Sequence, residues 1–493
     1  MSSFASNLIH LIPMTNSDKH LRTRFAPSPT GKLHIGGIRT ALYAWLVAKQ
    51  ANGQFILRIE DTDKSREEQG AIEHIQASLA WLGLTPDEGP QAGGDYGPYT
   101  QSDRLDIYLN YAQQLLDASH AYADPTTPEQ LKEWRRQAQA EKRPFHFRDH
   151  RPQNPPEWDS SLPLRFKIDA ERSPDWTDVI RGPMDGVSEN IDDFIIVKAD
   201  GYPTYNFAHI VDDHEMKISH VIRGDEFISS MPKFLLLHEA LGFTPPKFAH
   251  VPPILAPTGN KKLSKRDGAG DIFDYRDRGY LPATLVSFLA TLGWNDGSEQ
   301  EVFSRDELIE KFELSRVQKS GARYDEQRLV WLNGQFIRRL TLNELAAAVE
   351  DYWSNAAADS DDDYRLQVLS LVQERLKFFA ELPELTEFFF TRPDYNQVEL
   401  LDKKLTKKLD SKTAASWLET THQSLQGNDF NHDSLEATLR QLVDELDTKA
   451  GILFKLLRVA VTGQQVAPGL FETMAALGQN ETLARLELAK ATL

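Results

Sequence analysis

A strand, a glycine-rich turn, a helix and a second strand follow one another between residues 23 and 61, and this order constrains the fold more than any other feature. The run TRFAPS is extended, and QFILRIED forms the second strand. Between them Ile38, Leu42, Trp45 and Leu46 recur at helical spacing, and Gly53 provides a stop. A strand–helix–strand unit favours a parallel sheet covered by helices. The sequence therefore predicts an α/β fold.

The composition limits where such a protein works and what it binds. The chain has 493 residues, 40% of them hydrophobic, and a formal net charge of -18, which disfavours unspecific binding to nucleic acid or membranes but allows a local basic groove. It contains no cysteine, which excludes disulfides and cysteine-ligated zinc. No apolar run reaches the roughly 18 residues of a membrane span. Residues 1–22 lack the basic start of a signal peptide, and are either a tail or partly upstream of a start at Met14. We expect a cytoplasmic protein.

The α/β pattern is interrupted between residues 100 and 209. This stretch contains the polar, proline-rich segment RPFHFRDHRPQNPPEWDSSLP and three short strands in PLRFKI, TDVIRG and DFIIVKADG, which predict an inserted α+β module. The α/β pattern resumes with a strand in HVIRGDEF, a helix through MPKFLLLHEALG and a strand in KFAHVPPIL.

The C-terminal third changes character at Thr341, which has capping-box spacing to Glu344. Long amphipathic segments follow, in YRLQVLSLVQERLKFFAEL, SLEATLRQLVDEL and KAGILFKLLRVAVTG. This part of the chain is predicted to be all helical.

The turn GKLHIGG, residues 31–37, places His34 among glycines where a strand passes into a helix. Glycines let backbone N–H groups approach an anion, and the helix N-terminus adds a positive dipole. The pattern is neither a P-loop nor a dinucleotide fingerprint. On spacing alone, His34 fits a turn or capping residue as well as a catalytic one.

A cationic loop, TGNKKLSKRDG at residues 258–268, changes this balance. It concentrates Lys261, Lys262, Lys265 and Arg266 around glycine and serine. By itself it fits a solvated surface loop, whereas together with the His34 turn it forms a candidate clamp for polyphosphate.

Both segments resemble signature elements of a known family. LHIGG resembles the HIGH element of class I aminoacyl-tRNA synthetases, and KLSKR resembles their KMSKS loop. Gly37 stands where many class I enzymes have histidine, a replacement common in glutamyl enzymes. The resemblance to bacterial glutamyl-tRNA synthetases covers nearly the whole chain from Thr23. It includes RFAPSPTGKLHIGGIRTAL, LRIEDTD, DGYPTYNFAHIVDDH, VIRGDEF and SGARYDEQRLVWLNGQFIR.

The resemblance implies an architecture. It is an α/β, class I Rossmann-like catalytic domain with an inserted α+β acceptor-binding module, a helical stem-contact region and an all-α anticodon-binding domain. The expected ranges are an N-terminal tail at 1–22, the catalytic domain at 23–99 and 210–258, the inserted module at 100–209, the KMSKS-type loop and stem-contact region at 259–340, and the anticodon-binding domain at 341–493.

The resemblance also implies site residues. His34 and Lys265 would be catalytic, binding ATP and stabilising the pentavalent phosphorus. The ATP-binding elements begin at Pro27 and Lys262 and span residues 27–37 and 262–266. Their predicted ATP contacts are His34, Gly36, Gly37, Lys262, Ser264, Lys265 and Arg266.

The glutamate pocket is implied in the same way. Arg24 would face the substrate side-chain carboxylate, which suits the bidentate geometry of arginine. Glu60 would receive the ammonium, and Arg223 would lie near the substrate carboxylates. His209 stands where the family commonly has asparagine, so its contact with substrate is left open. The predicted pocket residues are Arg24, Ala26, Ser28, Glu60, Tyr205, His209 and Arg223.

No protein-held metal is expected. We interpret Asp61 and Asp63 as turn and helix-capping residues, and residues 212–214 (DDH) as a strand end leading into a loop rather than a metal cluster. Ala123 and Pro125 stand where zinc-binding members of the family have cysteine, so no structural zinc is expected. Mg²⁺ would be used only with ATP.

Basic residues suggest contacts with tRNA phosphates. In LDKKLTKKLD the four lysines are predicted on one helix face, which suits phosphate contact. Lys142, Arg143, Arg148 and Arg151 of the insertion fit either phosphate contacts or solvated charges. The lysines of the helix are Lys403, Lys404, Lys407 and Lys408.

The resemblance predicts a monomeric glutamate–tRNA ligase whose partners are L-glutamate, ATP and glutamate tRNA. It would form glutamyl-adenylate and pass the glutamyl group to the 3'-terminal adenosine, releasing AMP and diphosphate. The helical end favours this reading, because glutaminyl enzymes use β-barrels there. A non-discriminating or glutamine-tRNA-specific enzyme is the nearest alternative, and a catalytically silent tRNA-binding paralogue a more distant one.

Overall fold

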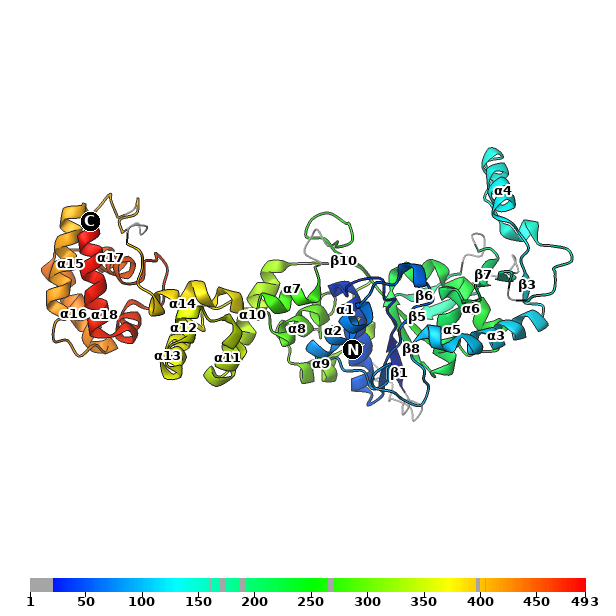
Figure 1. The fold of residues 1–493 in the computed structure, drawn as a ribbon, viewed down its shortest axis with the longest axis horizontal. Helices are drawn as coiled ribbons and strands as arrows, with labels where there is room; N and C mark the ends of the chain where they lie inside the picture. Colours follow the sequence, from blue (N-terminus) through cyan, green and yellow to red (C-terminus); the bar gives the residue numbers. More distant parts are fainter. Residues whose placement is uncertain are drawn as a thin grey trace, which may run out of the picture. The chain divides into compact units, whose positions relative to one another are not determined.

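The computed structural model describes residues 21–159, 161–168, 174–186, 191–264, 270–395, 400–403 and 405–493. Within it the chain separates into two compact units (Figure 1). The first unit comprises the described residues up to Asp274 and residues 285–325, and the second comprises residues 275–284 and 326–493. The six ranges expected from the sequence divide the chain more finely and stay predictions.

A six-stranded sheet in the order β2-β1-β8-β9-β5-β6 forms the centre of the first unit. Every pairing in it is parallel except that of β5 with β6. The predicted parallel α/β sheet is therefore confirmed. Its strands are β1 (Arg22–Phe25), β2 (Gln54–Leu57), β5 (Trp176–Asp178), β6 (Gly182–Met184), β8 (His220–Gly224) and β9 (Lys247–Val251).

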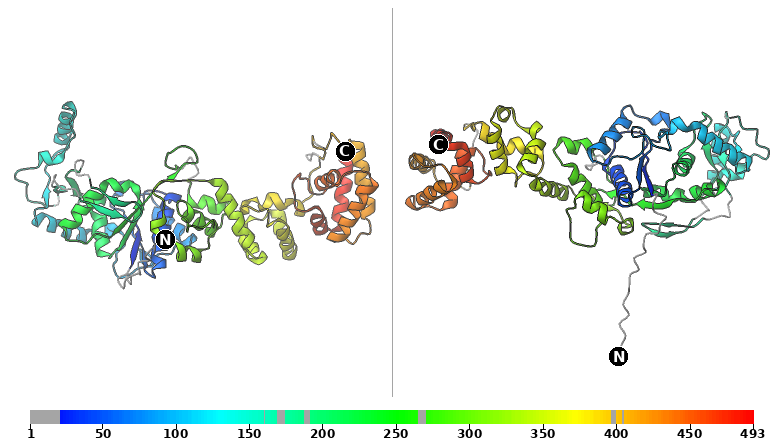
Figure 2. Two further views of the ribbon diagram at one scale, coloured as in Figure 1. Left: turned by 180° about the vertical axis from the view of Figure 1, so that it is seen from behind. Right: turned by 90° about the horizontal axis from the view of Figure 1, so that it is seen from below.

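Helices lie on both sides of this sheet (Figures 1 and 2). The crossover helix α1 (Ile35–Gln50) packs against β1, β2 and β8. The other side is covered by α3 (Leu105–Asp117), α5 (Tyr205–Glu215) and α6 (Met231–Ala240), whose apolar side chains share a core with residues of β8 and β9. The remaining helices of this unit include α2 (Ala71–Trp81) and α9 (Arg305–Lys311).

A second, three-stranded antiparallel sheet forms in the predicted insertion. It contains β3 (Ala121–Ala123), β4 (Leu164–Phe166) and β7 (Phe194–Val197). Helix α4 (Pro128–Ala140) begins with a capping box and projects from this part of the unit in both Figures 1 and 2.

The strand expected in TDVIRG forms, but it does not join the sheet of the insertion. It is β5, and it pairs with β9 in the main sheet. The physical reason is a buried polar contact, because Asp178 of β5 accepts hydrogen bonds from both the backbone and the ring of His250 in β9. Such a contact joins segments far apart in the sequence.

The regular elements of the second unit are all helices among its described residues, as predicted. Thr341 and Glu344 form the predicted capping box at the start of α11, and Gly463 ends α17 in a left-handed conformation. Its helices include α10 (Glu326–Arg339), α11 (Leu342–Ala348), α12 (Asn355–Ala358), α13 (Asp362–Val372), α14 (Leu382–Phe390), α15 (Ser411–Leu425), α16 (His432–Glu445), α17 (Ala450–Thr462) and α18 (Leu470–Thr492).

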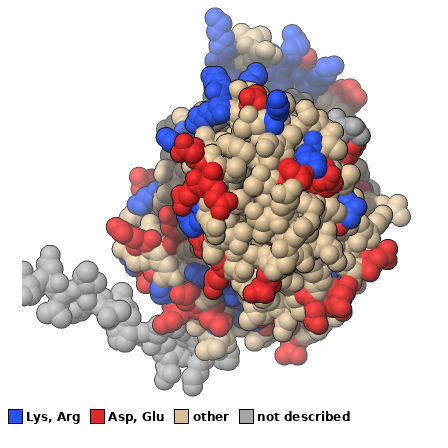
Figure 3. All heavy atoms as spheres, turned by 90° about the vertical axis from the view of Figure 1, so that its left-hand side faces the viewer, with Lys and Arg blue, Asp and Glu red and all other residues tan. Residues whose placement is uncertain are grey.

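Leucines and valines from α15 to α18 form one core of the second unit. Seen from the side of α15 and α16, this unit presents a broad face with few charged side chains, and acidic and basic groups are scattered around it (Figure 3). Among the described residues of the whole chain, no helix is both long and apolar enough to cross a membrane.

The predicted lysine-bearing helix in LDKKLTKKLD is wrong. Residues 401–403 and 405–410 contain turns instead of a helix, and Lys404 lies outside the described residues. Aspartates satisfy the backbone locally, since Asp402 accepts from the backbone of Leu405 at 2.8 Å and Asp410 caps α15. Asp402 thus caps a short turn, and the next regular helix begins only after Asp410.

Candidate active site

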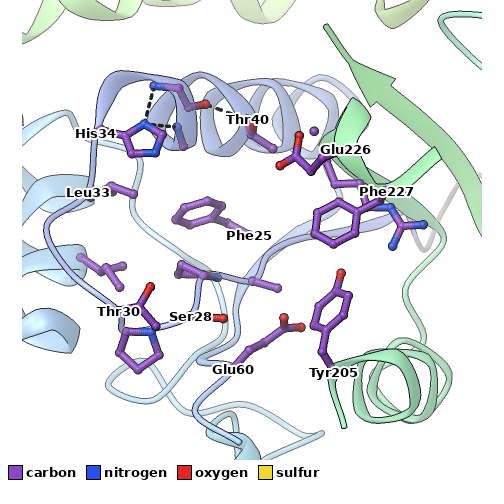
Figure 4. A pocket seen from close by; sticks show the side chains of 18 of the residues that line it. Phe25, Ser28, Thr30, Leu33, His34, Thr40, Glu60, Tyr205, Glu226 and Phe227 are labelled. Atoms are coloured by element: carbon purple, nitrogen blue, oxygen red, sulfur yellow. Dashed lines mark hydrogen bonds between the residues drawn. The ribbon is translucent and has the colours of Figure 1, made fainter. Parts of the chain in front are cut away.

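A cavity of about 850 Å³ opens at the carboxyl edge of the parallel strands. Its walls come from the ends of β1, β8 and β9, the segment after β2, the turn before α1 and the start of α5 (Figure 4). Ligands of open parallel sheets bind at this edge. Of the predicted residues, the cavity is lined by Arg24, Ala26, Ser28, His34, Gly36, Gly37, Glu60, Tyr205, Arg223 and Lys262.

His34 is the N-cap of α1 (Figure 4). Its Nδ1 accepts hydrogen bonds from the backbone N–H groups of Gly36 at 3.1 Å and Gly37 at 3.4 Å. The neutral ring therefore carries its proton on Nε2. Both glycines are closely packed, because a Cβ at Gly36 would lie 3.0 Å from the ring and one at Gly37 would lie 2.9 Å from the end of the Leu33 side chain. His34 is thus both a cap and a fixed donor.

An aspartate that the sequence analysis did not single out holds the turn in place. Asp271 lies 2.8 Å from the ammonium of Lys32 and 2.7 Å from Nε2 of His74. His74 in turn accepts from the backbone N–H of Leu33 through Nδ1 at 3.3 Å. Asp271 also pairs with His34 in an isolated β-bridge. The glycine-rich turn is therefore anchored on α2 and on the segment before α7 (Ile272–Asp277).

Buried charges meet at the opposite end of the cavity. Asp213 accepts from Arg58 at 2.7 Å and from Arg24 at 3.1 Å, and Arg58 also donates to Glu60 at 3.0 Å. All four residues are buried. Burial alone would raise the pKa of Asp213, but the charges of Arg24 and Arg58 outweigh it and hold that pKa below its usual range. Burial raises the pKa of Glu60, although both arginines oppose the shift.

The expectation of a strand end at residues 212–214 is wrong, because Asp212, Asp213 and His214 lie in α5. The two aspartates form ion pairs: Asp212 contacts Arg104 at 2.7 Å, and Asp213 contacts Arg58. Within the described part of the chain, no group of three or more histidines, cysteines or acids is arranged to hold a metal.

Arg223 is buried beside the cavity and close to Tyr205 and His209. The ring of His209 stacks on Tyr205 with 4.6 Å between the ring centroids, and its Nε2 lies 3.5 Å from Arg223. His209 is 2% exposed and does not line the cavity. His209 thus contacts two residues that line the cavity, Tyr205 and Arg223, and its own contact with substrate stays a prediction.

The cationic loop is only partly described. Lys262 lines the cavity, and its segment pairs with Leu255 in an isolated β-bridge. Ser264 ends the described part of the loop, and the predicted catalytic residue Lys265 lies outside the described residues together with Arg266.

Several charged residues of the site were missed. Arg58 and Asp213 form the ion-pair network, and Asp178 and His250 form a buried pair beside Arg223. Arg58 carries a sequence signal, since it is a lone cation within an apolar strand. The others have no local signal, because their partners come from distant segments.

The fold and the site define the class. Residues 20–331 match the family described as tRNA synthetases class I (E and Q), catalytic domain, and residues 344–490 match an anticodon binding domain. The first match covers most of the chain. The turn before α1 and the strand ends that line the cavity lie within the matched residues.

Individual relatives narrow this class. The chain is 44% identical to the glutamate–tRNA ligase of Dehalococcoides mccartyi, over 97% of this chain and 98% of the relative, and 44% identical to that of Roseiflexus sp., over 96% and 97%. It superposes on the crystal structure of a glutamate tRNA ligase from Elizabethkingia meningosepticum in complex with its amino acid, with a TM-score of 0.87, 36% identity, and coverage of 96% of this chain and 99% of the other. The chain therefore belongs to the glutamate–tRNA ligase family of class I tRNA synthetases.

Proposed function

We propose that this protein activates L-glutamate with ATP and transfers the glutamyl group to the 3'-terminal adenosine of glutamate tRNA, releasing AMP and diphosphate. One observation carries the proposal. A single cavity joins the N-terminus of α1, which suits phosphate, to two buried arginines and the buried Glu60, which suit an amino acid with two carboxylates.

The ATP end would work by positioning and electrostatics. The Nε2–H of His34 and the backbone N–H groups at the start of α1 would face the α-phosphate as the glutamate carboxylate attacks it. Lys262 would contact the diphosphate side, joined by Ser264, Lys265 and Arg266. Mg²⁺ would enter with ATP, since Mg²⁺ is commonly held by substrate phosphates and water. No protein-held zinc is part of the proposal.

The amino-acid end would distinguish glutamate by charge. Arg24 would face the side-chain carboxylate and Arg223 the substrate carboxylates, while Glu60 would accept the ammonium. Ala26, Ser28 and Tyr205 would shape the pocket around them. This assignment is supported by the lining of the cavity and by the rigid support of Arg24, whose Nε donates to Asp213.

The tRNA would contact both units. The insertion that carries α4 would bind the acceptor end, and the helical second unit would read the anticodon, which is supported by the match of residues 344–490 to an anticodon binding domain. Bound tRNA would complete the site for activation. We further propose a cytoplasmic monomer, whose mass in solution would equal that of one chain.

The test is aminoacylation by the purified protein. Glutamate-dependent ATP–pyrophosphate exchange is measured with and without tRNA, followed by charging of purified glutamate tRNA, glutamine tRNA and a glutamate tRNA with a substituted anticodon. We expect the protein to charge glutamate tRNA and to charge the tRNA with the substituted anticodon more slowly. Charging of glutamine tRNA would identify a non-discriminating or glutamine-tRNA-specific enzyme. Binding of tRNA without any exchange would identify a silent paralogue.

A further inference from the structure

Arg223 is a buried cation whose direct contacts are neutral groups, with Arg24 and Asp213 within electrostatic range. It is 4% exposed, and no carboxylate of the described residues lies at ion-pair distance from it. Its Nη2 lies 2.8 Å from the sulfur of Met231, and the guanidinium lies 5.0 Å from the ring centroid of Phe227 and 4.9 Å from that of Phe234. A desolvated cation that has no carboxylate in direct contact attracts an anionic ligand strongly.

This cation donates a hydrogen bond to a histidine of the neighbouring strand. Nε of Arg223 donates to Nε2 of His250 at 3.1 Å, and His250 is fully buried. For Nε2 to accept, the ring must be neutral and carry its proton on Nδ1. Burial lowers the pKa of His250, which favours this neutral form, although its bond to Asp178 opposes the shift.

Asp178 fixes that tautomer. Its Oδ2 lies 2.6 Å from Nδ1 of His250 and accepts the ring proton. Its Oδ1 is held by the backbone N–H groups of Ile180 at 3.0 Å and Arg181 at 2.9 Å. Burial alone would raise the pKa of Asp178, but the hydrogen bonds from His250 and the backbone keep that pKa below its usual range. Asp178 is therefore an ionised acceptor at neutral pH.

The sheet register sets these three side chains in a row. Arg223 of β8 pairs directly with His250 of β9, and Asp178 of β5 pairs with Phe248 of the same strand. The row thus crosses three neighbouring strands and ends at Arg223, which lines the cavity. Rigid strands hold such geometry better than loops do.

We propose that Asp178 and His250 are positioning residues of the glutamate site, with Asp178 fixing the His250 tautomer and His250 orienting Arg223 without neutralising it. This inference rests on the proposed function, in which Arg223 binds a substrate carboxylate. A carboxylate placed directly on Arg223 would compete with the substrate for its charge. An imidazole between Asp178 and Arg223 supplies the orientation and leaves the positive charge to the substrate.

The test compares three variants in steady-state aminoacylation of glutamate tRNA. His250→Leu removes the acceptor, and we expect the KM for glutamate to rise about 10-fold or more, as is common when an outer partner of a binding group is lost. His250→Gln can present an amide oxygen to Arg223, so it should rescue much of this loss. Asp178→Asn removes the tautomer lock and should raise the KM for glutamate. The KM for ATP should stay within about twofold in all three.

A double-mutant cycle separates positioning from stability. In an Arg223→Lys background, His250→Leu and Asp178→Asn should cause little further rise in the KM for glutamate, since their effect passes through Arg223. His238→Gln is the matched control: His238 is also buried, and its Nδ1 bonds to the backbone of Phe234 at 2.7 Å instead of contacting Arg223. It should leave the KM for glutamate unchanged even if the melting temperature falls.

Two failures can be told apart. If Arg223→Lys leaves the KM for glutamate unchanged, the assignment of Arg223 in the proposed function is wrong. If Arg223→Lys raises it, but the Asp178 and His250 variants change the KM for glutamate and ATP alike or add fully to Arg223→Lys, the positioning inference is overturned and the site assignment stands. Where His250→Leu does not fold, His250→Gln and Asp178→Asn decide by the same criterion.

Discussion

Asp213 and Arg58 form an ion pair that is almost completely removed from solvent, with 2.7 Å between Oδ1 and Nη1. The same oxygen accepts from Nε of Arg24 at 3.1 Å, and Arg58 also pairs with Glu60 at 3.0 Å. One carboxylate of α5 thus supports Arg24 of β1 and Arg58, which directly follows β2. Arg24 and Glu60, which are predicted to contact the side chain and the ammonium of glutamate, are therefore both held by this ion-pair network.

Neutralising Asp213 should therefore destabilise the first unit. In Asp213→Asn two buried guanidinium groups lose their common partner, and breaking a buried pair in this way costs about 3–5 kcal/mol of unfolding free energy. Urea unfolding followed by circular dichroism measures the loss. Glu133→Gln, at an exposed pair with Arg136, is the control and should leave the midpoint unchanged. Equal urea midpoints for Asp213→Asn and for the protein without substitutions would contradict a stabilising role of Asp213.

Arg24 should set the choice between glutamate and glutamine. Arg24→Gln removes the charge that we propose faces the substrate side chain. We expect kcat/KM for glutamate to fall by an amount equivalent to roughly 2–5 kcal/mol of transition-state stabilisation, with a smaller loss for glutamine. ATP–pyrophosphate exchange assays with both amino acids give the ratio of kcat/KM for glutamate to kcat/KM for glutamine. Arg22→Gln is a matched control on the same strand, because Arg22 is buried and paired with Glu88 outside the cavity. It should lower stability and leave the ratio unchanged. An equal loss for both amino acids in Arg24→Gln would make Arg24 a purely structural residue.

The features of the fold and of the site that could be predicted from sequence are the local ones. The His34 turn, the strand that carries Arg24 and the capping box at Thr341 depend on residues a few positions apart, so their patterns are visible in the chain itself. The parallel sheet followed equally from the order of strand, helix and strand.

The remaining features depend on partners that are distant in sequence. The sequence predicts a strand end leading into a loop at residues 212–214, whereas Asp213 lies in a helix and is compensated by Arg58, 155 residues away. The TDVIRG strand was assigned to the insertion, and its sheet is decided by the contact of Asp178 with His250, 72 residues away. The lysine-rich segment after residue 400 shows the reverse case, since its contacts are local: Asp402 caps a short turn, and Asp410 caps the helix that follows.

His34 should contribute separately to folding and to catalysis. His34→Asn keeps a good N-cap for α1 but loses the Nε2 donor, whereas His34→Ala loses both. We expect both variants to reduce ATP–pyrophosphate exchange about 10²-fold or more, and only His34→Ala to lose about 1 kcal/mol of stability. Thermal unfolding and exchange are measured on the same preparations. Near-normal exchange in His34→Asn would mean that His34 is only a cap.

Glu481 should make the stability of the second unit depend on pH. This residue of α18 pairs with Arg392 at 2.7 Å and with Arg485 at 2.8 Å. The hydrogen bond from Arg392, opposed by partial burial and reinforced by Arg485, lowers the pKa of Glu481 from 4.5 to about 2. Because the folded form has the lower pKa, the stabilisation is complete above the unfolded pKa of 4.5 and is lost as the pH falls from there toward 2.

Glu481→Gln should consequently weaken α17 and α18 at neutral pH and matter less in acid. Hydrogen exchange of peptides from these helices is compared at the same pH between Glu481→Gln and the protein with Glu481. The difference in protection between the two, called the protection gap, should be wider at pH 7 than at pH 3. Since Glu481 is partly exposed, solvent screens the pair and the gap will be smaller than for a fully buried ion pair. Glu487→Gln, at an exposed pair with Lys490 on the same helix, should produce no gap at either pH. A gap for Glu481→Gln that is as wide at pH 3 as at pH 7 would mean that packing of the side chain, and not its charge, holds α18 to Arg392.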